Sequence, residues 1–127
     1  MLVQFIVENF LSFNTRTAFS MMAAGGDEQH SDHIVTEGIG KAPPLLRAAA
    51  LYGANAAGKS NIVKAIQFAQ KLIQDGTRAG QTIPITPFKL GSDCQSSSRF
   101  EFVFVYQAVL YSYGFVLDSR YILEEWL

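Results

Sequence analysis

Apolar and polar residues alternate along the first twenty residues of the chain. The alternation has the period of a half-buried β-strand in residues 2–9, and after a turn it is repeated in residues 15–21. Strands joined by so short a connection pair in antiparallel fashion, so the pattern predicts an N-terminal β-hairpin within residues 1–24. The first strand is expected to place the following residues on opposite faces: Val3, Phe5 and Val7 against Gln4 and Glu8.

Three more alternating runs, rich in aromatic residues, lie near the other end of the chain. Only two or three residues separate one run from the next, and parallel strands need a much longer crossover. We therefore predict an antiparallel β-subdomain over residues 83–127, in which Gln107 and Asp118 occupy turns. The runs are Phe100–Tyr106, Val109–Leu117 and Tyr121–Glu125.

Between these regions the pattern changes twice. Residues 45–52 are almost uniformly apolar, with Arg47 as the exception, which is typical of a strand covered on both faces. A helix is the competing interpretation, because Ala and Leu favour helices, but the segment that follows favours the strand. A helix is then expected from near Gly58 to a stop at Asp75–Gly76. Its apolar face comprises Ile62, Ala65, Ile66, Ala69, Leu72 and Ile73.

Residues 25–40 form a polar, glycine-containing stretch that we expect to be a surface loop. The stretch contains one metal-like cluster, in which two His residues lie among carboxylates. No further ligand-rich segment completes a coordination sphere, so a solvated loop is favoured over a metal site. The cluster is Asp27, Glu28, His30, Asp32 and His33.

Composition and charge narrow the classes of partner. The chain has 127 residues, 49% of them hydrophobic and 17% charged, with a net charge of −1. Such a chain buries one core and has no basic field to attract nucleic acid or an anionic membrane. The aromatic residues between Phe100 and Trp126 are accompanied by one basic residue, Arg120, so a packed sheet is favoured over base stacking. Lys64 and Lys71 are expected on a solvated helix face.

The N-terminal apolar run is interrupted by Gln4 and Glu8, and no basic residue precedes Arg16, so a secretory signal is not expected. No apolar stretch approaches the length of a membrane span. The single cysteine, Cys94, excludes an internal disulfide and fits a reducing compartment. We expect a cytoplasmic protein.

The segment Gly53–Ser60 (GANAAGKS) matches the phosphate-binding motif G-x-x-x-x-G-K-[ST], called Walker A, at every fixed position. Gly53 and Gly58 permit backbone angles that let successive N–H groups turn toward a polyphosphate. Lys59 supplies a positive charge to the β- and γ-phosphates, and the Ser60 hydroxyl is placed to ligate Mg²⁺. The dipole of the following helix adds to this charge. A glycine-rich structural connection, or a decayed site, is the alternative.

The motif sets the candidate site. We expect nucleoside triphosphate binding, with Lys59 as the catalytic candidate and Ser60 as the Mg²⁺ ligand. No guanine-recognition motif is present in the sequence, which favours ATP over GTP. The nucleotide-binding candidates are Gly53, Ala54, Asn55, Ala56, Ala57, Gly58, Lys59, Ser60 and Asn61.

Two segments carry a family resemblance: Phe5–Phe13 (FIVENFLSF) and Leu51–Ile66 (LYGANAAGKSNIVKAI). They resemble the start of ABC-type ATPases of the RecF, SMC and OLD (overcoming lysogenization defect) kind. The nearest group is that of OLD-like AAA-family ATPases of bacterial abortive-infection, anti-phage defence and retron-associated systems. The resemblance continues through Pro87–Leu90 and the aromatic strands. It implies an α/β P-loop NTPase fold, with residues 1–127 forming the N-terminal lobe of an ATPase head.

The resemblance also implies how such a lobe works. In this family two ATPase heads enclose the nucleotide, each supplying Walker A to one nucleotide and a signature sequence to the other. The chain contains no Leu-Ser-Gly-Gly-like signature, late Walker B or switch histidine. Hydrolysis of Mg-ATP is therefore expected only once these segments complete the site. The resemblance implies a role in a bacterial anti-phage defence or DNA-maintenance complex. Expected partners are a second head and an effector nuclease or toxin subunit, and Ser12–Asn14 are expected near the adenine or ribose.

Two other functions remain open at this stage. In one, the chain is a self-contained small P-loop enzyme that uses Asp118, at the end of Phe115-Val-Leu-Asp118, as its Mg²⁺-binding acid. That requires a strand parallel to the one before the P-loop, whereas the short connections favour a hairpin turn at Asp118. In the other, the chain is an interaction subunit that binds nucleotide without turnover.

Overall fold

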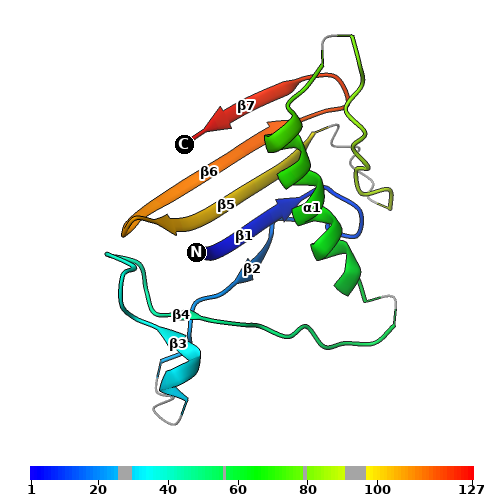
Figure 1. Cartoon of the computed structure of the whole chain (residues 1–127). Helices are drawn as coiled ribbons and strands as arrows, with labels where there is room; N and C mark the ends of the chain where they lie inside the picture. The colour runs from blue at the N-terminus through cyan, green and yellow to red at the C-terminus, as the bar shows by residue number, and fades with distance from the viewer. Residues whose placement is uncertain (26–29, 56, 79, 91–96) are drawn as a thin grey trace.

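The computed structural model describes residues 1–25, 30–55, 57–78, 80–90 and 97–127. One long helix, α1 (Lys59–Asp75), crosses one face of a five-stranded sheet (Figure 1). The strand order is β2-β1-β5-β6-β7, and every neighbouring pair is antiparallel. These strands are β1 (Leu2–Glu8), β2 (Thr17–Ser20), β5 (Ser98–Tyr106), β6 (Val109–Leu117) and β7 (Ile122–Trp126).

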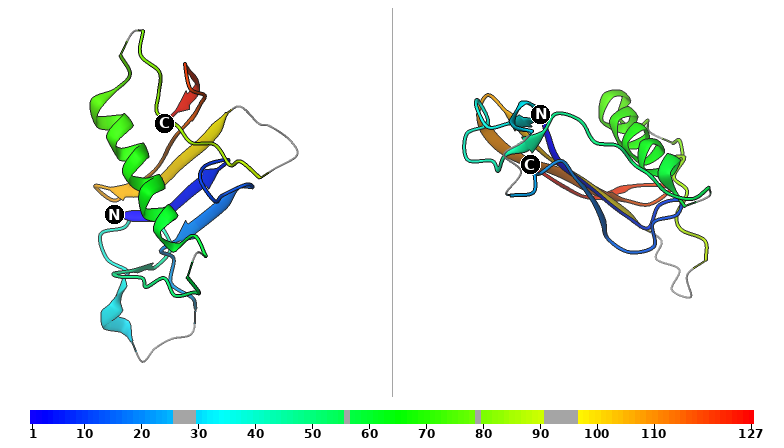
Figure 2. Two further views of the ribbon diagram at one scale, coloured as in Figure 1. Left: turned by 90° about the vertical axis from the view of Figure 1, so that its right-hand side faces the viewer. Right: turned by 90° about the horizontal axis from the view of Figure 1, so that it is seen from below.

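A smaller unit projects from the side of this sheet (Figure 2). It consists of the short 3-10 helix η1 (Ser31–His33) and a two-stranded sheet of β3 (Ile34–Val35) and β4 (Leu45–Leu46). Leu45 is fully buried in a small cluster with Val3, Ile39 and Val105, which attaches the unit to the main sheet.

The predicted N-terminal hairpin is confirmed, and the structure adds where it lies. Phe5 of β1 faces Phe19 of β2 on one side and Phe102 of β5 on the other. The N-terminal hairpin and the β5–β7 strands therefore form one continuous sheet, with β1 beside its centre. Because β1 is hydrogen-bonded to a strand on each side, its apolar residues lie next to those of β5, which is about 95 residues further along the chain.

The prediction that Val3 shares a face with Phe5 and Val7 was wrong. The pairing of β1 with β5 shifts register between Leu2 and Gln4, so Val3 is the extra residue of a β-bulge. Phe5 and Val7 pack in the cluster that includes the α1 residues, whereas Val3 packs with Ile39, Leu45 and Val105. One inserted residue reverses the side to which all earlier residues point.

The antiparallel strands predicted between residues 100 and 126 are confirmed. β5 and β6 pair along their whole length, from Ser98 opposite Leu117 to Tyr106 opposite Val109. Gln107 and Ala108 join them with φ angles of 48° and 60°, the left-handed conformation at both central positions of a type I′ turn. Gln107 is thus a turn residue, as predicted.

α1 packs on the sheet through small residues. Ala65 and Ala69 are fully buried and Ile62 nearly so, and all three belong to the cluster that contains Phe5, Phe100 and Phe115. Phe68 lies 5.3 Å from Phe100 between ring centroids, at a tilt favourable for aromatic pairs. Ile73, expected on the same face, is 45% exposed, because it borders an open pocket with Met1, Phe104 and Tyr113 instead of the closed core.

The expected buried strand at residues 45–52 was wrong except for β4. Residues 47–54 have no strand structure, and Leu51 and Tyr52 are 49% and 92% exposed. A buried strand needs neighbours that take up its backbone hydrogen bonds, and among the described residues no strand pairs with this segment beyond Leu46. The connection into the loop is therefore extended and solvated.

In the part of the chain that the structure describes, no helix has the length and apolarity to cross a membrane.

Gly114 gives a direct test of the sheet packing. A Cβ on Gly114 would lie 2.2 Å from Cζ2 of Trp126 and 2.8 Å from the carbonyl oxygen of Phe100. We therefore expect Gly114→Ala to lower the free energy of unfolding by about 1–3 kcal/mol, the usual cost of overpacking. It will also change the emission of Trp126, the single tryptophan. Urea unfolding measures both effects.

The matched control is Gly25→Ala, because a Cβ at Gly25 meets nothing within 4 Å. It should leave the stability within about 0.5 kcal/mol of the wild type. Equal stabilities for the two variants would mean that Trp126 does not lie over Gly114.

Candidate functional site

The loop before α1 closes on its own lysine. The Lys59 ammonium donates hydrogen bonds to the carbonyl oxygens of Gly53 at 2.7 Å and Ala54 at 2.6 Å. The Ala57 N–H donates to the Ala54 carbonyl at 3.2 Å, which tightens the turn. Lys59 thus bridges the first and last parts of the predicted site, and its charge lies inside the loop. Ala56, another predicted site residue, lies outside the described residues.

Gly58 turns the chain from this loop into α1. It is the N-cap residue, with φ 84° and ψ 4°, a left-handed conformation that suits glycine. The Asn61 N–H already donates to the Gly58 carbonyl at 2.9 Å, whereas no side chain caps this helix end among the described residues. The remaining first-turn N–H groups and the positive end of the helix dipole are therefore available to an anion. Ser60, in this first turn, is exposed.

The turn between β1 and β2 lies against the same glycine. A Cβ on Gly58 would lie 2.8 Å from Oγ of Ser12. A cavity of about 240 Å³ opens beside the loop, and most of its lining is apolar. It is lined by Phe13, Thr17, Ala18, Phe19, Leu51, Tyr52, Ala57, Gly58, Lys59 and Ile62. The structure thus brings Ser12 and Phe13, linked to the site only by resemblance, next to the phosphate-binding motif. Hydrophobic periodicity carries no signal for this contact.

Asp118 is a turn residue, so its interpretation as a Walker B acid was wrong. It follows β6, which is antiparallel to both β5 and β7. Its Oδ1 accepts hydrogen bonds from the backbone N–H groups of Arg120 at 2.6 Å and Tyr121 at 2.8 Å. The hydrogen bond from Arg120 has the larger effect and that from Tyr121 the next largest. Together they hold the pKa of the Asp118 carboxyl below its ordinary value. The self-contained small enzyme that depended on Asp118 is thereby excluded.

The metal-like cluster is only partly described, since Asp27 and Glu28 lie outside the described residues. The rings of His30 and His33 meet edge to face at 5.9 Å. Among the residues that the structure places, no group of three or more His, Cys, Asp or Glu side chains could hold a metal ion. Cys94 also lies in an undescribed segment.

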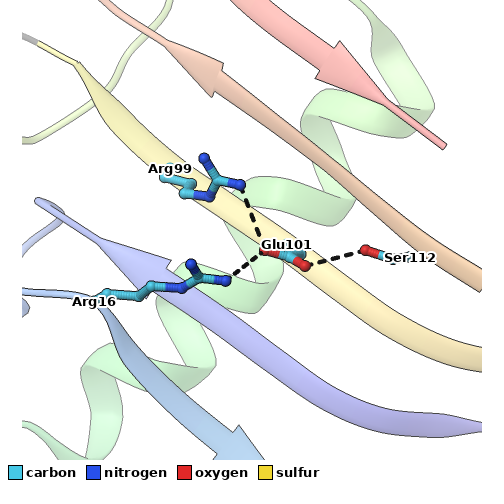
Figure 3. A network of polar contacts seen from close by, with 4 residues as sticks. All are labelled: Arg16, Arg99, Glu101 and Ser112. Atoms are coloured by element: carbon cyan, nitrogen blue, oxygen red, sulfur yellow. Dashed lines mark hydrogen bonds and ion pairs between the residues drawn. The ribbon is translucent and has the colours of Figure 1, made fainter.

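A second charged cluster lies on the face of the sheet turned away from α1 (Figure 3). Glu101 accepts a hydrogen bond from Arg16 at 3.1 Å and one from the Ser112 hydroxyl at 3.0 Å. Arg99 is 3.7 Å from the same carboxylate, and its guanidinium lies 4.3 Å from the centre of the Trp126 ring. Arg16 and Arg99 are thus engaged within the sheet, away from the Lys59 loop.

Comparison with known protein families gives a match over residues 48–127, well over half of the chain. The matching family is described as "AAA domain, putative AbiEii toxin, Type IV TA system". The chain belongs to this AAA domain family. No curated protein and no solved structure matches the chain.

Membership of this family accounts for the presence of the Lys59 loop. AAA domains are P-loop NTPases, and the match begins just before Gly53 and contains the Lys59 loop, α1 and β5–β7. The AAA domain family therefore supports the expected class of ATPase, one of the abortive-infection type. β1, β2 and the Ser12 turn precede the matched region, so their contact with the loop comes from the structure alone.

The conformation of Gly58 predicts a specific cost of substitution. Gly58→Ala should lower the free energy of unfolding by about 1–2 kcal/mol, because a side chain is unfavourable in left-handed backbone. Gly38, with φ 71° and no atom within 4 Å of a built Cβ, is the control. Gly58→Ala should cost more than Gly38→Ala, and Ser12→Ala should remove the excess in a urea-unfolding cycle. Equal costs of Gly58→Ala and Gly38→Ala with Ser12 in place would contradict the contact.

The lowered pKa of Asp118 predicts that the stability of the fold depends on pH. A carboxyl whose folded-state pKa is lowered stabilises the fold above its unfolded-state pKa, and the effect disappears as the pH falls through the folded-state pKa. Asp118→Ala should therefore lower the melting temperature at neutral pH, and the difference from the wild type should vanish in strong acid. Thermal unfolding across pH 2–7 measures it. Glu124→Ala, which removes an exposed carboxylate of β7, is the control. A constant difference would contradict the turn role.

Proposed function

We propose that this AAA domain binds Mg-ATP in the loop and helix start formed by Gly53, Ala54, Asn55, Ala56, Ala57, Gly58, Lys59, Ser60 and Asn61. The observation that carries the proposal is the position of the Lys59 ammonium, inside the loop and at the N-terminus of α1. The carbonyls that now accept its hydrogen bonds belong to the loop itself, so the ammonium would exchange these acceptors for phosphate oxygens when a nucleotide binds. Loop, lysine and helix dipole then act on one ligand.

The residues present fit a magnesium ion held with the nucleotide. The Ser60 hydroxyl is exposed and lies next to Lys59 on the first turn of α1. A hydroxyl oxygen together with phosphate oxygens is the hard-oxygen ligand set that Mg²⁺ prefers. When bound, the ion would neutralise charge on the β- and γ-phosphates, while Ser60 would orient it and Lys59 would hold the phosphates.

The apolar cavity beside the loop is the proposed place for the base and ribose. Phe13, Phe19 and Tyr52 give it aromatic surface, and Lys59 is also part of its lining. An apolar, partly aromatic wall with a few polar groups is typical of a small-molecule site. Tyr52 is almost fully exposed, so its ring is available for stacking on a base. The adenine end and the phosphate end of ATP would thus lie on the two sides of Lys59.

We infer that hydrolysis requires residues beyond those described here. Asp118, the candidate Mg²⁺-binding acid, instead accepts backbone hydrogen bonds within a turn. In the ABC-type head of the RecF, SMC and OLD kind that the sequence resembles, the N-terminal lobe supplies Walker A, and Walker B and signature segments complete catalysis. Residues 1–127 would be that lobe, with the segments 1–24, 25–40, 45–76 and 83–127 as its parts. Lys59 would serve catalysis by stabilising charge on the γ-phosphate.

A nucleotide-binding interaction subunit without turnover is the second candidate. This candidate is favoured by the same observation, that the Asp118 carboxyl accepts hydrogen bonds within a turn. Hydrolysis of ATP when the chain is mixed with its partners, but not alone, supports the head-lobe proposal, whereas binding without turnover in the mixture supports the subunit.

The biological role follows from the family and is part of the proposal. The family description names a toxin of a type IV toxin–antitoxin system. We propose that the domain works in the cytoplasm in an antiviral defence system, pairs with a second ATPase head, and controls a nuclease or toxin effector. The net charge of −1 gives no support for direct binding to nucleic acid.

Substitution of Lys59 tests the proposal. Lys59→Ala removes the charge that holds the phosphates, and a hydrogen bond to a charged group contributes about 1.5–3 kcal/mol. We therefore expect Mg-ATP affinity to fall roughly 10–150-fold by isothermal titration calorimetry.

Lys64→Ala and Lys71→Ala are matched controls, since each removes one exposed lysine from the same helix. Both should retain wild-type affinity. Equal affinity losses in all three variants would show that overall charge, and not the loop, attracts the nucleotide. Wild-type affinity in Lys59→Ala would refute the proposed site.

A further inference from the structure

The turn from Asn9 to Phe13, between β1 and β2, is more firmly held than an exposed connection requires. Phe10 and Phe13 exchange two backbone hydrogen bonds, of 3.0 and 2.9 Å, which close the turn. The Leu11 N–H donates to the Thr86 carbonyl at 2.9 Å. Ser12 lies at the exposed tip, and it is the residue whose hydroxyl meets Gly58. The turn therefore connects the phosphate-binding end of α1 with a chain segment far from it in sequence.

Asn9 forms the base of this turn. It is 5% exposed and has a φ of 49°, a left-handed conformation that Asn tolerates better than most residues. Its Nδ2 donates to the Ser97 carbonyl at 2.8 Å, and its Oδ1 accepts from the Phe88 N–H at 3.1 Å. Its own carbonyl accepts a hydrogen bond from the Ser98 hydroxyl. Asn9 thus joins the end of β1 to the start of β5 and to the segment before it.

Gly58 needs such support. Glycine loses more conformational freedom on ordering than any other residue, and among the described residues no side chain caps α1 at this point. The Ser12 hydroxyl occupies the space beside Gly58 into which a Cβ would point. A loop held in its binding conformation before the ligand arrives binds more tightly, because less ordering remains to be done.

We propose that Asn9 is a positioning residue for the nucleotide site: through its buried hydrogen bonds it holds Ser12 against Gly58 and keeps the loop in its binding conformation. Asn9 itself touches no nucleotide in this scheme and acts through Ser12. The consequence for affinity rests on the proposed function, whereas the effect on the loop does not. The two are therefore measured separately.

The test compares two substitutions that make the same backbone change. Asn9→Gly keeps the left-handed angle and removes the side-chain hydrogen bonds to Ser97 and Phe88. Gln107→Gly makes the same backbone change at a residue with φ 48° in the β5–β6 turn. That turn is at the opposite end of the sheet, since β1 pairs Leu2 with Phe104 and Glu8 with Arg99. Both variants gain backbone freedom in the unfolded chain, but only one acts on the Ser12 turn.

The first readout is taken without nucleotide, from amide chemical shifts and hydrogen exchange at Gly58–Asn61. We expect these amides to shift in Asn9→Gly and to exchange at least about 5-fold faster, with no change in Gln107→Gly. Ser12→Ala should reproduce the change with a melting temperature close to that of the wild type, because Ser12 is exposed. Asn9→Asp keeps the acceptor for Phe88 but turns a buried carboxylate toward the Ser97 carbonyl, so it should change these amides in the same way as Asn9→Gly.

The second readout is Mg-ATP affinity. We expect it to fall about 5–10-fold in Asn9→Gly and Ser12→Ala and to stay unchanged in Gln107→Gly, whatever the melting temperatures. If Asn9→Gly does not fold, Ser12→Ala and Asn9→Asp decide by the same two readouts.

The outcomes separate the two proposals. Unchanged Gly58–Asn61 amides in Asn9→Gly and Ser12→Ala would overturn the positioning role, even if the wild type binds ATP. Altered amides in a wild type that binds no nucleotide would leave the positioning of the loop standing and refute the proposed function. Equal effects of Asn9→Gly and Gln107→Gly on the loop would show that Asn9 acts through overall stability alone, which also overturns the role.

Discussion

The structure depends on the packing of α1 against one face of the antiparallel sheet. Ala65 and Ala69 have no exposed surface, and their small side chains let the helix backbone approach the phenylalanines of β1, β5 and β6. Burying such aromatic rings is the largest source of stability that a chain of this size has. Because α1 is 17 residues long, its contact with the sheet also determines where its two ends lie.

The functional end of the molecule follows from that contact. With α1 fixed on the sheet, its N-terminus lies beside the turn that connects β1 and β2, where Ser12 and Phe13 meet Gly58 and the cavity next to it. Lys59 then folds back on the loop carbonyls. The Lys59 loop thus lies against the turn of the N-terminal hairpin, although this hairpin precedes the region matched by the family.

Local patterns were sufficient to predict part of this arrangement. Alternation and short connections predicted β1, β2 and the three C-terminal strands, because side-chain direction in a strand repeats every two residues. The GKS motif predicted the loop, since Gly58 and Lys59 are needed for local chemistry. The bulge at Val3 could not be predicted, because a bulge is a property of the pairing with β5. The strand expected before the loop failed at Leu51 and Tyr52 for a related reason: apolar sequence forms a strand only where another strand accepts its hydrogen bonds. The Ser12–Gly58 contact joins residues 46 positions apart and leaves no periodic signal.

The central claim is that the Lys59 loop, together with the adjoining turn, is a nucleotide site. It is tested most directly by ¹H–¹⁵N correlation spectra of the intact chain titrated with Mg-ATP. If the loop and the turn form such a site, saturable shifts occur at Gly53–Asn61, Phe13 and Tyr52, while amides of β7 stay in place. Shifts confined to other regions, or no saturable shift at Gly58–Asn61, would contradict it.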